Sequence, residues 1–219
     1  MSIRIIKPGI LDTIQDLGRY GYQHLGINPG GVMDHFATQV VNGLVANEIN
    51  DAVIEMHFPA ATILFQQEAL IAIGGADFIP SINGEKIQLW QPVMINKNCL
   101  LHFHPSSQGA RCYLALKDGF TLNKWLTSYS TNVKAGAGGF NGRALHKDDV
   151  IYLRNQNDYR KFLGDKDFIV LPWKADIDWD NNFNKEIKVL PGNEWDYFTN
   201  DAKNIFINQP FTITASSDR

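Results

Sequence analysis

Polar side chains that can bind a small molecule or move a proton gather between residues 7 and 47, among several glycines. Most of this polarity cannot sit in an ordinary core without partners, and the glycines let the backbone turn tightly. Glycines also precede a helix expected to begin at Asp34, whose unpaired N–H groups and positive dipole end suit an anionic or carbonyl oxygen. The polar residues of the stretch are Gln15, Asp16, Arg19, His24, Asn28 and Asp34.

Asp16 and Arg19 lie on either side of a glycine, so we expect a turn in which the carboxylate and the guanidinium face each other. Taken alone, such a pair is most simply a surface ion pair of small energetic value. The neighbouring Gln15, His24 and the Asn-Pro-Gly-Gly turn over 28–31 instead favour a binding role for the whole cluster.

A second glycine-rich segment, residues 135–153, reads AGAGGFNGRALHKDDVIYL. It matches neither GxGxxG nor the P-loop motif, and it leads into an expected strand, so both nucleotide-binding fingerprints are excluded. Two interpretations stay open. The segment is either a tight connection whose glycines need positive φ, or a backbone nest that binds an anion together with Arg143.

Histidines offer a weaker pattern. His102 and His104 are two positions apart, so on a strand they share a face and could meet a metal with His57 or Glu55. Nothing else at ligand spacing supports a metal. Partly exposed strand histidines are therefore the favoured interpretation, and no metal site is predicted.

Nucleophile candidates are equally weak on pattern alone. Ser128, Ser130 and Thr131 lie in LTSYSTN, which lacks the GxSxG of a nucleophile elbow, so these hydroxyls are expected to satisfy a loop. Cys99 and Cys112 are the only cysteines and lie in apolar contexts, which favours two buried free thiols over a disulfide.

Composition excludes several classes of protein. The 219 residues carry a formal net charge of −3 with a pI near 6.0, and the basic residues are scattered, so neither nucleic acid nor an anionic membrane surface is an expected partner. The N-terminus lacks an apolar signal region, and the apolar run over 69–79 is too short and interrupted to cross a bilayer. We therefore predict a cytoplasmic protein.

The elements that must position these residues are mostly strands. Short β-type runs recur at the spacing of a sandwich or barrel, Asn83-Gly84 marks a hairpin, and the stretch 176–184 is polar enough for a long loop or linker. One amphipathic helix is expected over 34–47, capped by Asp34, with Phe36 and Val41 on its apolar face, and a shorter helix over 122–128. The expected strands are 3–6, 52–56, 61–65, 70–73, 92–96, 100–104, 111–117, 150–153, 168–171, 187–190 and 211–214.

The motifs TIQDLGR, GGVMD, SYST and SSDR, in this order, resemble those of the KipA / allophanate hydrolase subunit 2 family, also described as biotin-dependent carboxyltransferase-like. Its members include the C subunit of the prokaryotic ATP-dependent 5-oxoprolinase and half of the carboxyltransferase domain of urea carboxylase. The resemblance runs over the whole chain and implies one carboxyltransferase A/B-like domain over 1–219, with a sub-boundary in the 176–185 loop. It implies a mainly β, cyclophilin-like β-barrel with one clear helix near the N-terminus. Because the family pattern continues past SSDR, we also expect the chain to be shortened at its C-terminus.

The resemblance implies roles for individual residues. The family's substrates are compact and amide-like, so Asp16 or Asp34 would accept an N–H group or act as base, Gln15 would orient the amide, and Arg19 or Arg143 would stabilise developing negative charge. The implied substrate-binding residues are His24, Gly30, Gly31, Asn47, Glu55, Ser128, Ser130, Thr131, Ser217, Asp218 and Arg219.

Three functions follow from the resemblance. The leading hypothesis is a 5-oxoprolinase subunit that works with a KipI-like partner and a LamB/YcsF-like third subunit, with ATP bound through the complex. The second is a carboxyltransferase half that moves a carboxyl group from carboxybiotin to urea or a similar amide, the only case that needs biotin. The third is a non-enzymatic regulator that binds a KipI-like kinase inhibitor.

Overall fold

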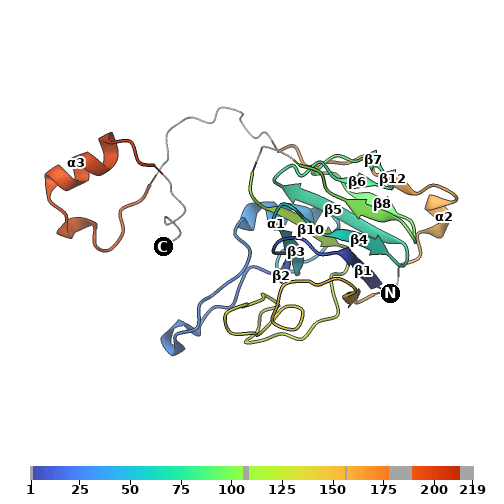
Figure 1. Ribbon diagram of the computed structural model, residues 1–219, viewed down its shortest axis with the longest axis horizontal. Coiled ribbons are helices and arrows are strands. Elements are labelled where there is room, and N and C mark those ends of the chain that lie inside the picture. Colours follow the sequence, from blue (N-terminus) through green and yellow to red (C-terminus); the bar gives the residue numbers. More distant parts are fainter. Residues whose placement is uncertain (1, 106–108, 156, 178–188, 213–219) are drawn as a thin grey trace. The chain divides into compact units, whose positions relative to one another are not determined.

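A computed structural model describes residues 2–105, 109–155, 157–177 and 189–212 (Figure 1). The chain divides into two compact units, Met1–Ile177 and Asp178–Arg219. The division falls in the polar stretch for which a loop or linker was predicted, most of which lies outside the described residues.

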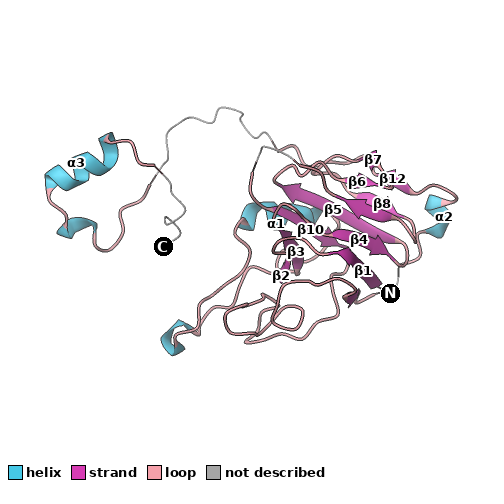
Figure 2. Ribbon diagram, in the orientation of Figure 1, coloured by secondary structure: helices cyan, strands magenta, loops and turns pink. Residues whose placement is uncertain are grey.

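The first unit is built from two antiparallel sheets, and the residues that the structure describes contain few helices, as Figure 2 shows. One sheet has the order β11-β1-β4-β9-β6-β7 and the other has the order β12-β8-β5-β10-β3-β2. The first contains β1 (Ser2–Lys7), β4 (Thr62–Phe65), β6 (Ser81–Ile82), β7 (Glu85–Lys86), β9 (Leu100–His102) and β11 (Val150–Tyr152). The second contains β2 (Thr13–Gln15), β3 (Val53–Met56), β5 (Ala69–Gly75), β8 (Val93–Ile95), β10 (Cys112–Leu116) and β12 (Phe168–Val170).

The predicted mainly β class is confirmed, but the described strands form two open sheets rather than a closed barrel. The main core fills the space between them, with Ile63 and Leu101 from one sheet and Ile54 and Leu114 from the other. Because side chains alternate along a strand, the opposite face of the second sheet carries a separate apolar set. This arrangement explains why every residue of β10 is buried.

Helix α1 (His35–Leu44) covers that second face, where Ala37 and Val41 pack with residues of β3, β5 and β10. Asp34 caps the helix as predicted, because its Oδ1 accepts a hydrogen bond from Ala37 N at 2.9 Å. Phe36, predicted on the apolar face, is instead 55% exposed.

Most predicted strands are confirmed, and so is the Asn83-Gly84 hairpin, which joins β6 to β7. The helix predicted over 122–128 is wrong, because Trp125 and Ser128 pair across a tight two-residue turn. The strands predicted over 187–190 and 211–214 are absent from their described parts, 189–190 and 211–212. Sequence inspection missed the short β2, the 3₁₀ turn η1 (Gln23–Leu25) and the helix α2 (Arg160–Leu163).

In the second unit, the described residues 189–212 form a 3₁₀ turn, η2 (Trp195–Tyr197), and helix α3 (Asn200–Asn208). Thr199 caps α3 by accepting a hydrogen bond from Ala202 N at 3.2 Å. Trp195 meets Phe206 edge-on at 5.8 Å between ring centres. None of the described residues of this unit is fully buried.

Candidate functional site

Asp16 follows β2, and its buried carboxylate joins two loops that leave the sheets at the same end of the unit (Figure 1). Ser128 Oγ and Ser130 Oγ each donate to Oδ1 at 2.6 Å, and Gly18 N donates to it at 2.9 Å. Tyr129 N donates to Oδ2 at 2.6 Å. Charge-assisted hydrogen bonds of this kind are strong, so Asp16 fixes the 128–130 segment against its own turn.

Arg19 lies at the other end of the same turn and is fully buried. Its backbone N donates to Pro29 O at 2.8 Å, its Nη2 donates to Ser130 O, and the centre of the Trp125 ring lies 4.6 Å from its Cζ. Its Nε and Nη1 are buried without a hydrogen-bond partner. Burial lowers the pKa of the Arg19 guanidinium, and the negative charge of Asp16 opposes that effect. The site therefore contains a buried cation with unused donors.

The expected surface ion pair between Asp16 and Arg19 is wrong. Asp16 is 1% exposed and Arg19 is 0% exposed, and no ion pair within the described ranges joins them. A buried charge is costly unless it is paired or hydrogen-bonded, so the two charges here are held by the 128–130 segment rather than by solvent.

Gln15, the last residue of β2, binds the carbonyl of Thr131, which directly follows the 128–130 segment. Its Nε2 donates to Thr131 O at 3.3 Å and to Thr13 Oγ1 at 2.9 Å, while its Oε1 is buried without a partner. Thr131 is tied back to β2, since its Oγ1 donates to Ile14 O at 2.8 Å. Gln15 thus has an unused acceptor, and it binds the carbonyl that follows, in sequence, the one that Arg19 binds.

Glycines are required where the loops touch. A Cβ on Gly31, which has φ of 97°, would lie 2.9 Å from backbone atoms of the turn that precedes Arg19. A Cβ on Gly138, with φ of 72°, would collide with the carbonyl oxygen of Ser130. At Gly30 the added atom would lie 3.0 Å from Arg19 Nη1, so this glycine forms part of the cover over the guanidinium.

Glu55 and Asp34 anchor the loop that leads into α1. Glu55 lies on β3, is 7% exposed and accepts a hydrogen bond from Met33 N at 2.8 Å. Asp34 N donates to Tyr113 OH at 2.9 Å. Burial, and then the negative charge of Glu55, raise the pKa of the Tyr113 hydroxyl. These bonds hold the 28–34 loop on the sheet, and the Asp34 side chain is occupied separately as a helix cap that accepts from Ala37 N.

Arg143 and Asn47 make separate contacts. Arg143 binds both oxygens of Asp149, with Nη1 at 2.7 Å from Oδ2 and Nη2 at 2.8 Å from Oδ1. Asn47 accepts from Asp118 N at 2.7 Å and donates to Leu116 O at 2.8 Å. The structure therefore gives both side chains partners outside the Asp16–Arg19 region.

The histidines also have partners of their own. His102 and His104 lie within hydrogen-bonding distance of side-chain hydroxyls, and His57 Nδ1 lies 2.8 Å from a backbone carbonyl. In the part of the chain that the structure describes, no group of three or more His, Cys, Asp or Glu residues could hold a metal ion. His24 is exposed in η1. The remaining predicted site residues, Ser217, Asp218 and Arg219, lie outside the described residues.

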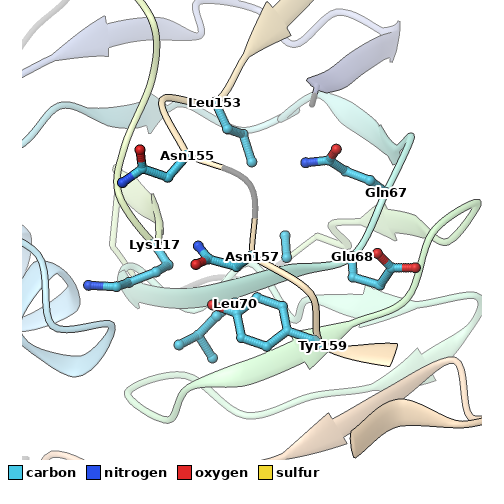
Figure 3. A pocket seen from close by; sticks show the side chains of 9 residues that line it. Gln67, Glu68, Leu70, Lys117, Leu153, Asn155, Asn157 and Tyr159 are labelled. Atoms are coloured by element: carbon cyan, nitrogen blue, oxygen red, sulfur yellow. The ribbon is translucent and has the colours of Figure 1, made fainter. Parts of the chain in front are cut away.

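Two cavities among the described residues are lined by none of the predicted site residues. The first, seen in Figure 3, has a volume of about 10 Å³, which is space for about one water molecule. The second, of about 730 Å³, lies within residues 189–211. The lining of the first is Gln67, Glu68, Ala69, Leu70, Lys117, Leu153, Asn155, Asn157 and Tyr159.

Sequence inspection missed Trp125 and Tyr113 as neighbours of the site. Because Trp125 was predicted to lie in a helix over 122–128, no contact with the 16–19 turn was expected. Nothing in the sequence around Tyr113 pointed to a role beyond its place on a strand. The SYST motif was the available signal, since Ser128, Ser130 and Thr131 all contact β2 or the turn after it.

Comparison with known proteins agrees with this two-sheet architecture. A family profile described as "Carboxyltransferase domain, subdomain A and B" matches residues 25–219. The crystal structure of the K. lactis urea amidolyase superposes with a TM-score of 0.69 at 29% identity, covering 70% of this chain and 9% of that one.

Two curated relatives align with different shares of this chain. Urea amidolyase of Saccharomyces cerevisiae is 35% identical over 153 residues, which is 69% of this chain and 8% of that protein. The C subunit of 5-oxoprolinase from Escherichia coli is 27% identical over 218 residues, 99% of this chain and 66% of that protein. The chain thus spans just under two thirds of the bacterial relative and less than a tenth of the yeast one.

The two sheets define a mainly β protein whose fold matches that of a urea amidolyase structure. The chain belongs to the carboxyltransferase domain family, subdomains A and B, as its motifs predicted. No helix within the described ranges is long and apolar enough to cross a membrane.

Proposed function

We propose that this chain is a subunit of an ATP-dependent 5-oxoprolinase, which hydrolyses 5-oxoproline to glutamate together with a KipI-like partner and a LamB/YcsF-like third subunit. The bacterial relatives named as the C subunit of 5-oxoprolinase support this assignment, because the alignment with one of them covers 99% of this chain. The structural observation that carries it is the buried Arg19 guanidinium, whose Nε and Nη1 have no partner.

The chemistry of 5-oxoproline suits these unused groups. Its carboxylate can accept a charge-assisted hydrogen bond from one unpaired Arg19 donor, and its lactam N–H can donate to the unpaired Oε1 of Gln15. The two side chains donate hydrogen bonds to consecutive carbonyls, Arg19 to that of Ser130 and Gln15 to that of Thr131. Because Arg19 is fully covered, in this proposal its surroundings must rearrange when the substrate binds.

The glycine-rich loop does not fit a phosphate group. The Arg143 guanidinium is already bound at both nitrogens by Asp149, and Gly142 N donates to Gly138 O at 2.8 Å inside the loop. We therefore assign no nucleotide step to this loop and place ATP elsewhere in the complex. Asp16, whose carboxylate holds the 128–130 segment, acts in this proposal as a structural anion rather than a base.

A second candidate is favoured by the 35% identity to a urea amidolyase and by the structural match to another. In it, the chain is half of a carboxyltransferase that moves a carboxyl group from carboxybiotin, supplied by another chain, to urea or a similar amide. The same Arg19 donors would then hold the carboxylate that is transferred.

The test is to purify the full-length protein with its partner subunits and to measure ATP-dependent glutamate formation from 5-oxoproline. Arg19→Lys should lower kcat/KM by about 100-fold, the loss expected for a hydrogen bond to a charged group. The matched control is Arg160→Lys, because Arg160 pairs with Asp158 at the surface, and it should keep wild-type activity.

Absence of glutamate from the complete wild-type complex would contradict the proposal. Carboxylation of urea at the expense of carboxybiotin would instead support the second candidate. Tight binding of the KipI-like protein without turnover of either substrate would favour a regulator.

A further inference from the structure

Trp125 and Ser128 are the ends of a tight hairpin. Trp125 N donates to Ser128 O at 2.9 Å, and Ser128 N donates to Trp125 O at 3.2 Å. Between them, Leu126 and Thr127 have φ of 49° and 70°, the two positive values that a type I′ turn needs. The hairpin therefore fixes the position of the indole relative to the Ser128 hydroxyl.

The two ends of this hairpin contact the two charged residues of the 16–19 turn. Ser128 Oγ donates to Asp16 Oδ1 at 2.6 Å, and the ring of Trp125 lies over the Arg19 guanidinium at 4.6 Å. One rigid element thus reaches both charges, although the sequence separates it from them by more than a hundred residues.

The indole of Trp125 can stabilise the Arg19 cation without using any of its N–H donors. An aromatic ring attracts a guanidinium through the electron density of its face and needs none of the N–H groups, which point outward in the guanidinium plane. Nε and Nη1 of Arg19 are the groups left without a partner, and burial lowers the pKa of this side chain. The ring offsets part of the cost of burial and leaves the donors available.

We propose that Trp125 is a positioning residue, which orients the Arg19 guanidinium so that one of its donors without a partner, Nε or Nη1, is presented to the carboxylate of the substrate. The kinetic consequence rests on the proposed function, whereas the positioning itself does not.

The kinetic experiment compares three variants in the complete complex with 5-oxoproline as substrate. Trp125→Leu should raise KM about tenfold while kcat changes less, because it removes a desolvated cation–π contact. Trp125→Phe keeps an aromatic face and should restore most of the affinity. Trp173→Phe is the control, since Trp173 is half exposed and its Nε1 bonds to Leu44 O. Equal KM values for Trp125→Leu and wild type would overturn the proposal.

A spectroscopic experiment tests the positioning without any substrate. In the ¹⁵N-labelled full-length protein, the Hε resonance of Arg19, identified by its loss in Arg19→Lys, should be displaced by the ring current of the indole. Trp125→Leu should abolish that displacement and Trp125→Phe should keep part of it. An unchanged resonance in Trp125→Leu overturns the proposal, even if 5-oxoproline is turned over. A displaced resonance without turnover instead refutes the proposed function and leaves the positioning intact.

Discussion

Replacing Asp12 by asparagine should remove a large part of the pH dependence of stability. Asp12 is fully buried, its Oδ2 accepts from Gly9 N at 3.1 Å and from Ala61 N at 2.8 Å, and its Oδ1 is buried without a partner. Burial is the largest effect on this carboxyl group and raises its pKa from 3.8 to about 7, against the opposing effect of the backbone hydrogen bonds.

The magnitude follows from that pKa. A rise from 3.8 to about 7 corresponds to about 4 kcal/mol between the two protonation states. Because the pKa is higher in the folded state, the folded protein retains a proton that the unfolded chain has released. This contribution to stability is complete below pH 3.8 and is lost as the pH rises through about 7. Between pH 5 and pH 8 the loss is about 3 kcal/mol.

The assay is urea unfolding of wild type and Asp12→Asn at pH 5 and at pH 8. Asparagine can still accept from the two backbone N–H groups and cannot ionise, so wild type should lose about 3 kcal/mol more than the variant over this interval. Asp165→Asn, a change at an exposed carboxylate, is the control and should follow wild type. If wild type and Asp12→Asn show the same pH dependence, the carboxyl is not buried as described and the reasoning is refuted.

Other predictions concern the loops and the thiols. Ser130→Ala removes a hydroxyl that donates to the buried Asp16 carboxylate, and it should lower the free energy of unfolding by about 2 kcal/mol in urea titrations. The control Thr127→Ala, at an exposed hydroxyl, should change it by less than about 0.5 kcal/mol. Gly138→Ala should cost at least about 2 kcal/mol in the same assay, against about 1 kcal/mol for Gly136→Ala, which has positive φ but open space around it. Equal losses of stability in Gly138→Ala and Gly136→Ala would contradict the close approach of Gly138 to the Ser130 carbonyl. Cys112 should resist a thiol reagent at pH 8 until the protein is unfolded, because burial raises the pKa of its thiol, and rapid labelling of the native protein would contradict this.

The strands and one helix were predictable because local rules dictate them. Short β-type runs at regular spacing indicated most of both sheets, Asn83-Gly84 indicated a hairpin in which Asn83 has φ of 48°, and Asp34 marked the start of α1. In each case the residues that form the element also carry the signal, so no distant contact was needed.

The contacts of the candidate site were harder to predict, because they join residues more than a hundred positions apart. Asp16 and Arg19 resembled a surface pair, since the sequence does not show that Ser128 and Ser130 would supply buried partners. Trp125 fitted a helix by local propensity, but its pairing with Ser128 overrides that preference. The family motifs identified the 16–19 turn and the 128–131 segment as parts of one site, but they did not indicate how the two segments contact each other.

The central claim is that Arg19 recognises a carboxylate, and 2-pyrrolidinone, which is 5-oxoproline without that group, tests it most directly. The measurement is the ratio of kcat/KM for 5-oxoproline to that for 2-pyrrolidinone, in the complete wild-type complex and with Arg19→Met. Wild type should prefer 5-oxoproline by about 100-fold, and this preference should disappear in Arg19→Met. An equal preference in both proteins would contradict the claim.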